Sequence, residues 1–278
     1  MAHTPFFVTG VPKSGTTWLG KLLDAHPQIN CKGEACIHQF IRSLFQIGNE
    51  YNRMLENRAG KFSDLNEFPT MTEADIHEIG RFFVEQRLRT IADPHKPELT
   101  WVGEKDPFHM AYLPILNAEF PEAKVIHIIR DGRAVVVSAW HHTLQLNPEA
   151  AKAAGFDRFM DEAAGNWADM IRRAWETRGI LGDRYLELRY EALLADPEGE
   201  LAKVLTFLGA RAGEEVKACV EAASFQKLAK GREQGQEDKQ SFFRKGISDD
   251  WKTFMNAGQI QRFDGRAKGM LKALGYLD

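Results

Sequence analysis

Gly10-Val-Pro-Lys-Ser-Gly-Thr-Thr-Trp18 is the stretch of sequence that decides the fold. It follows the apolar run Phe6-Phe-Val8 and precedes a helix-like segment from Leu19 to Ala25. A strand, a turn bounded by glycines and a helix start form a cradle for an anion. Backbone N–H groups at the helix N-terminus point at such a ligand, and the helix dipole favours negative charge there. The order predicts a phosphate-binding loop between the first strand and the first helix.

This loop differs at one position from the nucleotide-binding pattern G-x-x-x-x-G-K-[ST]. Thr16 follows the second glycine, where the pattern has lysine, and the lysine of this loop is Lys13. Because Lys13 lies inside the loop, its charge reaches a different phosphate oxygen and can follow a leaving group. The hydroxyl groups of Ser14, Thr16 and Thr17 add hydrogen-bond donors. These residues predict phosphate binding, and the alternative is an ordinary turn before a well-capped helix.

Composition excludes several classes of protein. The chain has 278 residues and a net charge near −3, which provides no general attraction to nucleic acid or to an anionic membrane. Its cysteines, Cys31, Cys36 and Cys219, form no close pair and match no common zinc spacing. No signal peptide is evident, and no run approaches the roughly 18 apolar residues that a membrane span needs. We therefore expect a cytoplasmic protein with no membrane span, no metal site and no nucleic-acid partner.

Short apolar segments alternate with longer segments rich in Ala, Leu, Glu and Arg. The expected strands are Phe6–Thr9, Trp101–Glu104, Val125–Ile129 and Tyr185–Leu188, and the expected helices are 16–25, 35–58, 73–92, 131–146, 157–179, 197–222 and 256–274. Such alternation is typical of a parallel sheet. We expect one α/β domain over residues 1–278, with a central parallel sheet flanked by helices. Lys230–Lys245 is polar and lacks periodicity, which predicts a mobile loop, with a lid as one role.

Chemistry-bearing residues follow three of the expected strands. The first strand ends in the 10–17 loop, the second in Glu104-Lys105-Asp106-Pro107 and the third in Arg130-Asp131-Gly132-Arg133. In a parallel sheet, ligands bind outside the carboxyl ends of the strands. An arginine such as Arg130 can bind a phosphate bidentately. The three strand ends therefore predict a local anion site, although the third also reads as an ordinary capped junction.

A third basic cluster lies near the C-terminus, where Phe242-Phe-Arg-Lys-Gly246 is followed by Asp249-Asp-Trp-Lys252. After a mobile loop, two basic residues and a glycine can close over an anionic ligand. A solvated charged loop is the alternative.

Glu34 reaches the same edge by a geometric argument. A helix from Thr16 to Ala25 descends about 15 Å, and an extended segment Gln28–Lys32 rises about 16 Å. Glu34 then lies beside the 10–17 loop, where a carboxylate can accept a proton from a substrate hydroxyl. The alternative is a solvated loop glutamate.

Together these motifs resemble the sulfotransferase superfamily, whose members use 3′-phosphoadenosine 5′-phosphosulfate (PAPS). Pro12-Lys-Ser-Gly-Thr-Thr-Trp18 resembles the 5′-phosphosulfate loop. Arg130-Asp-Gly-Arg-Ala-Val-Val-Val-Ser138 resembles the 3′-phosphate motif, and Arg244-Lys-Gly246 with Asp250-Trp-Lys252 resembles the C-terminal motif of the cytosolic branch. The resemblance runs from Phe6 to about Asp264 and implies the P-loop-like sulfotransferase fold.

The resemblance also implies a role for each matching residue. Lys13, Ser14, Gly15, Thr16 and Thr17 hold the 5′-phosphosulfate; Trp18 and Phe225 flank the adenine; Arg130, Ser138, Arg244, Lys245 and Gly246 bind the 3′-phosphate; Tyr190 lies near the cofactor; and Lys105 lies near the transferring sulfuryl group. Lys13 also stabilises charge as the product, 3′-phosphoadenosine 5′-phosphate (PAP), leaves. The reaction needs no metal, because lysines supply the positive charge.

The catalytic base depends on which branch of the superfamily the chain follows. Cys31-Lys-Gly-Glu34 and Lys105-Asp-Pro-Phe108 resemble the protein-tyrosine sulfotransferases, and Glu34 matches their catalytic base. The cytosolic branch has a histidine two residues after the matching lysine, where this chain has Pro107. The nearest histidine is His109. This departure favours Glu34 as the base and leaves His109 as the alternative.

The sequence leaves three further questions open. A P-loop kinase or NTPase, with Asp131 as a metal ligand, and an inactive PAP-binding module are the competing functions. The acceptor is a hydroxyl of a small molecule, a lipid or a glycan, in a pocket expected to be walled by 36–70 and 140–160 with their aromatic residues Phe40, Phe45, Tyr51, Phe62, Phe68, Trp140 and Phe156. Oligomeric state cannot be read from the chain.

Overall fold

A computed structural model describes residues 3–60 and 68–278, and Phe62 lies outside these residues. Its centre is a sheet of five parallel strands in the order β2-β3-β1-β4-β5. The strands are β1 (Thr4–Thr9), β2 (Ile29–Lys32), β3 (Trp101–Lys105), β4 (Lys124–Ile129) and β5 (Tyr185–Arg189). The sheet confirms the predicted α/β fold, and the extended segment before Glu34 is its edge strand β2.

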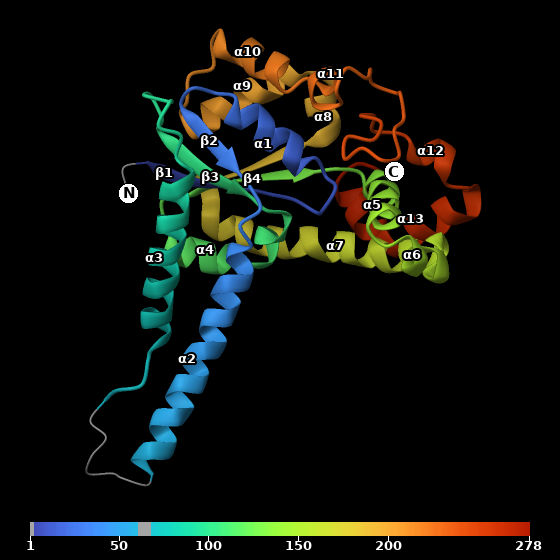
Figure 1. The fold of residues 1–278 in the computed structure, drawn as a ribbon. Coiled ribbons are helices and arrows are strands. Elements are labelled where there is room, and N and C mark those ends of the chain that lie inside the picture. Colours follow the sequence, from blue (N-terminus) through green and yellow to red (C-terminus); the bar gives the residue numbers. More distant parts are fainter. Residues whose placement is uncertain (1–2, 61–67) are drawn as a thin grey trace.

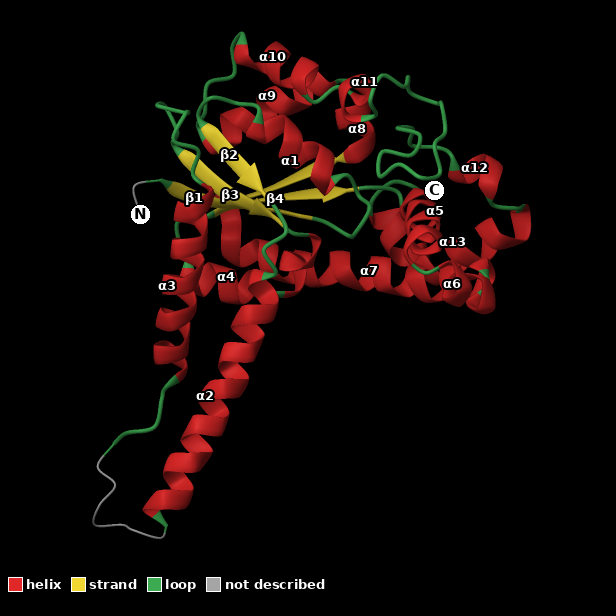
Figure 2. Cartoon of the chain, in the orientation of Figure 1, coloured by secondary structure: helices red, strands yellow, loops and turns green. Residues whose placement is uncertain are grey.

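The sheet lies between helical layers (Figures 1 and 2). On one face lie α1 (Thr16–Asp24), α8 (Tyr190–Ala195), α9 (Pro197–Leu208) and α10 (Glu215–Ala222). On the other lie α4 (Leu113–Glu119), α5 (Gly132–Leu146), α7 (Phe156–Leu181) and α13 (Ala257–Ala273). Helices α2 (Ile37–Ala59) and α3 (Glu73–Ile91) run side by side and project away from the sheet (Figure 1).

The central strand shows why both faces are covered. Phe6, Phe7 and Val8 of β1 are fully buried, and successive side chains of a strand point to opposite faces. Phe6 packs among the residues of α1 and α9, whereas Phe7 packs against α2, α3 and α4. An almost continuous apolar strand is therefore stable only between two helical layers.

The expected helix over 197–222 is wrong as one element. Its first part, α9, ends at Gly209, which adopts a left-handed conformation with φ 80°, and α10 begins at Glu215.

Several short elements were not predicted from the sequence: the 3-10 helices η2 (Pro107–Ala111) and η3 (Gly182–Arg184), and α4, α6 (Pro148–Ala154), α8, α11 (Phe225–Leu228) and α12 (Trp251–Phe254). Residues 230–245 contain no helix or strand, as expected of a loop. In the described ranges, none of the helices has the length and apolarity to cross a membrane.

Glu119, at the end of α4, is a buried acid away from the sheet edge. It is 2% exposed, its Oε1 lies 3.4 Å from His77 Nδ1, and burial raises its pKa to about 7 against the opposing charge of Arg81. An acid whose pKa is raised by folding stabilises the fold while it is protonated, and this contribution is lost as the pH rises through 7.

Glu119 alone should therefore lower the unfolding free energy between about pH 5 and pH 8. One pKa unit is worth about 1.4 kcal/mol, so this contribution is on the order of 2–3 kcal/mol. Burial lowers the pKa of His26 and His127, which changes stability in the opposite direction over part of this range. Denaturant melts at both pH values therefore compare wild type with Glu119→Gln: relative to the variant, the wild type should lose about 2–3 kcal/mol between the two pH values. An equal pH dependence of the two proteins would contradict this role of Glu119.

Candidate active site

The loop between β1 and α1 turns tightly at the carboxyl edge of the sheet. Gly15 has φ +102°, and a Cβ atom at Gly10 would lie 2.4 Å from the carbonyl oxygen of Ile128, so both positions require glycine. The N–H of Ser14 donates to the carbonyl of Val11 at 2.9 Å. The Ser14 side chain is buried, and its Oγ has no hydrogen-bond partner among the described residues. The loop thus holds a hydroxyl donor that none of the described residues uses.

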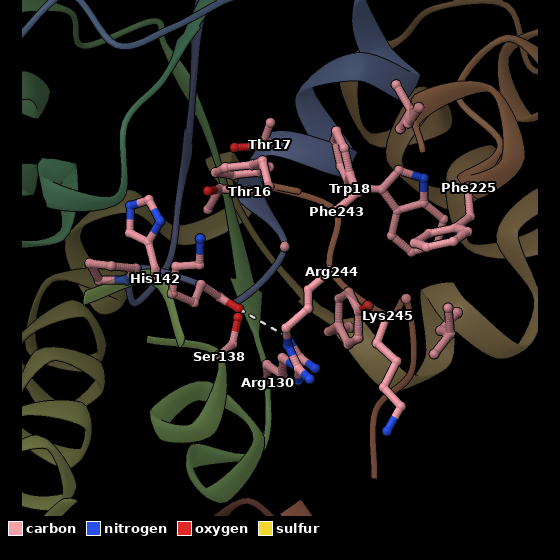
Figure 3. A pocket seen from close by; sticks show the side chains of 18 of the residues that line it. Thr16, Thr17, Trp18, Arg130, Ser138, His142, Phe225, Phe243, Arg244 and Lys245 are labelled. Atoms are coloured by element: carbon pink, nitrogen blue, oxygen red, sulfur yellow. Dashed lines mark hydrogen bonds between the residues drawn. The ribbon is translucent and has the colours of Figure 1, made fainter. Parts of the chain in front are cut away.

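A cavity of about 470 Å³ opens beside this loop (Figure 3). Thirteen of the fifteen residues predicted for the site line it: Lys13, Gly15, Thr16, Thr17, Trp18, Glu34, Arg130, Ser138, Tyr190, Phe225, Arg244, Lys245 and Gly246. The other two lie next to the wall, since Ser14 is inside the loop and Lys105 contacts Glu34. Folding therefore brings together motifs that are more than 200 residues apart in the chain.

Arg130 links the first strand-end loop to the C-terminal motif. Its Nη1 donates to the carbonyl of Lys13 at 3.1 Å, and its Nη2 donates to the carbonyl of Ile247 at 2.9 Å. The guanidinium lies 4.3 Å from the centre of the Tyr190 ring. The side chain is largely buried, yet its Nε has no partner among the described residues. A fixed cation with an unused donor is suited to binding an anion in the cavity.

Aromatic rings form one end of the cavity. The Trp18 Nε1 donates to the carbonyl of Ala223 at 3.0 Å, and the Trp18 ring meets the Tyr190 ring edge-on at 5.9 Å. Phe225 lines the same cavity as Trp18 (Figure 3). A Cβ atom at Gly246 would lie 2.5 Å from the Phe225 ring, so the glycine allows this ring to approach the chain. These rings give the cavity an apolar end, and Lys13, Arg130, Arg244 and Lys245 add basic groups elsewhere in its lining.

The two cations of the C-terminal motif are already paired. Arg244 contacts Glu237 and Asp250, and Lys245 Nζ lies 2.5 Å from Asp250 Oδ1. Burial raises the pKa of Asp250, but the hydrogen bonds from Lys245 and Arg244 outweigh it and hold that pKa below its ordinary value. Asp250 therefore stays ionised and holds both basic residues at the cavity wall.

Lys13, Lys105 and Glu34 meet where the three strand ends converge. Lys105 Nζ donates to Glu34 Oε1 at 2.5 Å, and the Glu34 side chain is 44% exposed. The Lys13 ammonium lies 4.2 Å from the centre of the Phe242 ring. Burial and, to a smaller extent, the nearby charges of Arg130 and Lys105 together lower the pKa of Lys13 to about 8, although the Glu34 carboxylate acts in the opposite direction. An excess of positive charge is thus present before any ligand arrives.

His109 lies away from the cavity. It is fully buried in η2, its ring meets Phe7 edge-on at 5.1 Å, and its Nε2 lies 3.2 Å from Glu104 Oε2. Of the two candidate bases, Glu34 is the one that lines the cavity.

Asp131 is held by Arg133 rather than left free. Its Oδ1 accepts from the Arg133 N–H at 2.9 Å and caps α5, and its Oδ2 accepts from Arg133 Nη2 at 2.8 Å. Asp131 is therefore poorly placed to bind the metal that the kinase interpretation needs. In the part of the chain that the structure describes, no three acidic, histidine or cysteine side chains form a group that could hold a metal.

The sequence interpretation missed part of the wall and misplaced another part. Phe108, His142 and the pair Phe242-Phe243 line the cavity, and the aromatic pair beside Arg244 was the available signal. The aromatic residues expected to wall an acceptor pocket do not line it where they are described. Phe40 stacks on Phe83, and Trp140 packs against Phe156 and Phe159. Aromatic residues in helices more often fill the core than a pocket.

Comparison with known proteins adds three findings. The model of the sulfotransferase family matches residues 5–214. Protein-tyrosine sulfotransferase 1 of zebrafish (Danio rerio) is 29% identical over 204 residues, which are 73% of this chain and 52% of that protein. Sulfotransferase 1A1 of rat (Rattus norvegicus) is 27% identical over 272 residues, which are 92% of this chain and 81% of that protein. The chain thus spans about half of the length of the protein-tyrosine sulfotransferase.

Among solved structures, mouse sulfotransferase SULT7A1 complexed with PAP has a similar fold. The TM-score is 0.61 at 18% identity, and the match covers 98% of this chain and 84% of that one. At this identity the likeness concerns the fold.

Proposed function

Because this chain belongs to the sulfotransferase family, we propose that it transfers a sulfuryl group from PAPS to an acceptor hydroxyl and releases PAP. The observation that carries the proposal is the convergence of three basic motifs and an aromatic end on one cavity of about 470 Å³. A doubly phosphorylated adenine nucleotide fits such a cavity, because its planar base suits the aromatic end and its two anionic groups suit the basic motifs.

The loop residues and Arg130 suit the two anionic ends of PAPS. The 5′-phosphosulfate occupies the 10–17 loop, where backbone N–H groups at the start of α1 and the hydroxyls of Thr16 and Thr17 donate to it. The 3′-phosphate lies between Arg130, Ser138 and the pair Arg244-Lys245. Support for this assignment comes from the fact that these four side chains line one cavity.

At the aromatic end, Trp18 and Phe225 flank the adenine. The fixed Trp18 indole and the Tyr190 ring beneath Arg130 make this end rigid. Stacking then orients the nucleotide at little cost in side-chain entropy.

The reaction is an in-line displacement at sulfur. The acceptor oxygen attacks the sulfur while Glu34 takes the hydroxyl proton. The bond between sulfur and the bridging oxygen breaks, its electron pair stays on the 5′-phosphate of PAP, and Lys13 stabilises the charge that develops there. Lys105 orients Glu34 through their 2.5 Å contact and adds positive charge beside the transferring group. These lysines and Arg130 take the part that a metal plays in phosphoryl transfer.

The acceptor enters beside Glu34, in a cavity whose lining also includes Phe108, His142 and Phe242. These neighbours favour an acceptor with an apolar or aromatic body, and a small molecule, a lipid or a glycan with such a part remains the proposed class. An acceptor screen with PAPS tests the function. The product is detected as a mass gain of the acceptor of about 80 Da, the mass of the transferred SO₃ unit. Parallel reactions with ATP and Mg²⁺ should give no phosphorylated product.

Lys13 makes nucleotide binding depend on pH. In the free protein its pKa is about 8, so the ammonium is charged below pH 8 and neutral above it. A bound 5′-phosphate favours the charged form and raises this pKa. We therefore expect PAP binding to take up nearly one proton near pH 9 and to weaken as the pH rises beyond 8.

Calorimetry in buffers of different ionisation enthalpy measures this uptake. Lys13→Met should abolish the uptake at pH 9. An uptake that persists in the variant would show that another group titrates.

A further inference from the structure

The peptide bond between Arg130 and Asp131 is held at both of its polar groups by side chains. The Trp167 Nε1 donates to the Arg130 carbonyl at 3.1 Å, and the Asp131 N–H donates to Glu191 Oε1 at 3.0 Å. Trp167 is 1% exposed, so its position is fixed by the core. Glu191 is only partly buried, and its position therefore depends on what else it contacts.

Tyr276 supplies the second contact of Glu191. The Tyr276 hydroxyl donates to Glu191 Oε2 at 2.8 Å. Burial and the neighbouring Glu191 carboxylate both raise the pKa of Tyr276, so the phenol stays protonated and acts as the donor. Each oxygen of the Glu191 carboxylate thus has its own N–H or O–H partner.

Tyr276 is itself fixed against the same region. Its carbonyl accepts from Arg133 Nη2 at 2.9 Å, and the Arg189 guanidinium lies 5.2 Å from the centre of its ring. Gly275, with φ +70°, turns the chain back after α13, and the Tyr276 N–H donates to the Leu271 carbonyl. Figure 1 shows this end of the chain beside α5. Residues far apart in the sequence therefore brace the start of α5.

Tyr276 does not line the cavity, so it acts only through its neighbours. Glu191 follows Tyr190, whose ring lies 4.3 Å from the Arg130 guanidinium. Arg130 is thus supported from its backbone by Glu191 and from its side chain by Tyr190, which are consecutive residues at the start of α8. The Tyr276 hydroxyl fixes the first of these supports, through Glu191.

We propose that Tyr276 is a positioning residue of the phosphate site: its hydroxyl holds Glu191, and Glu191 sets the backbone from which Arg130 reaches the 3′-phosphate. This inference rests on the proposed function, because it assumes that the cavity binds PAP.

Tyr276→Phe tests the inference by removing one oxygen atom. Tyr276→Phe removes a hydrogen bond that supports Arg130 but no other proposed phosphate ligand. We therefore expect the Kd for PAP to rise roughly 3- to 10-fold, which corresponds to the free energy of one hydrogen bond. The Kd for adenosine 5′-monophosphate, which lacks the 3′-phosphate, should stay within about twofold because the rest of the site is intact. A merely structural role would weaken both nucleotides alike or change only the melting temperature.

Two further variants sharpen the test. Tyr185→Phe removes another largely buried phenol, at the end of β5 opposite to Glu191, whose hydroxyl lies 2.5 Å from His127 Nδ1. This control should leave both Kd values unchanged. In a Glu191→Ala background, Tyr276→Phe should have no further effect on PAP binding, because the two residues act in series.

The outcomes separate the two proposals. If the wild type binds neither nucleotide, the proposed function fails. If the wild type binds PAP but Tyr276→Phe leaves the ratio of the two Kd values unchanged, or if its effect persists in Glu191→Ala, the positioning role is rejected.

Discussion

Glu34→Gln should lower kcat by about 10²- to 10⁴-fold, the usual contribution of a general base. Glutamine keeps an oxygen that can accept from Lys105 Nζ, which lies 2.5 Å from Glu34 Oε1 in the wild type. The substitution therefore removes the proton-accepting carboxylate while it leaves that contact in place. The Kd for PAP should change little, because the residues assigned to the two phosphate groups are untouched.

The measurement is PAP release at saturating PAPS and acceptor, with PAP binding determined in parallel. Glu50→Gln, which changes an exposed glutamate on α2, is the matched control and should retain wild-type turnover. A Glu34→Gln enzyme within about fivefold of wild type would reject Glu34 as the base.

Lys13→Met should lower kcat by about 10²- to 10³-fold, as the loss of one preorganised charge at a leaving oxygen does. Methionine has a similar length and keeps the apolar contact with Phe242, over whose ring the ammonium lies at 4.2 Å. Because the charge on the bridging oxygen develops only as its bond to sulfur breaks, the loss should appear more in kcat than in the Kd for PAPS, in which that bond is intact.

Single-turnover kinetics with PAPS and an identified acceptor separate the chemical step from binding. Lys21→Met, at an exposed position of α1, removes a lysine from the same helix region and should have no effect. If Lys13→Met weakened PAPS binding but left the single-turnover rate intact, the leaving-group role of Lys13 would be wrong.

Local sequence signals predicted the sheet because each strand carries them itself. Phe6-Phe-Val8 is a continuous apolar run and Val125–Ile129 is apolar except for His127, and both lie in strands buried on two faces. Helix ends were harder to predict. Gly209 ends α9 in a left-handed conformation, and the alanine-rich sequence on both sides of it predicts helix throughout. A single glycine does not show from sequence alone whether it lies within a helix or ends it.

Most residues that line the cavity were predictable because they cluster in short motifs, each next to a strand or helix end. The aromatic residues of its wall were not, since their placement depends on long-range packing. The sequence does not distinguish Phe40 and Trp140 from Phe242. Only the tertiary structure shows that Phe40 and Trp140 pack against other aromatic residues, whereas Phe242 lines the cavity. Tyr276 gave no signal at all, because its role depends on contacts with residues 85 and 143 positions earlier in the chain.

The central claim is that three separated basic motifs form one site for a doubly phosphorylated adenine nucleotide. A calorimetric titration of the purified protein with PAP and, separately, with adenosine 5′-monophosphate tests it most directly. The account predicts one PAP site per chain, with affinity roughly tenfold or more above that of the monophosphate, because Arg130, Arg244 and Lys245 are proposed to contact only the 3′-phosphate. Absence of PAP binding, or equal affinity for the two nucleotides, would contradict it.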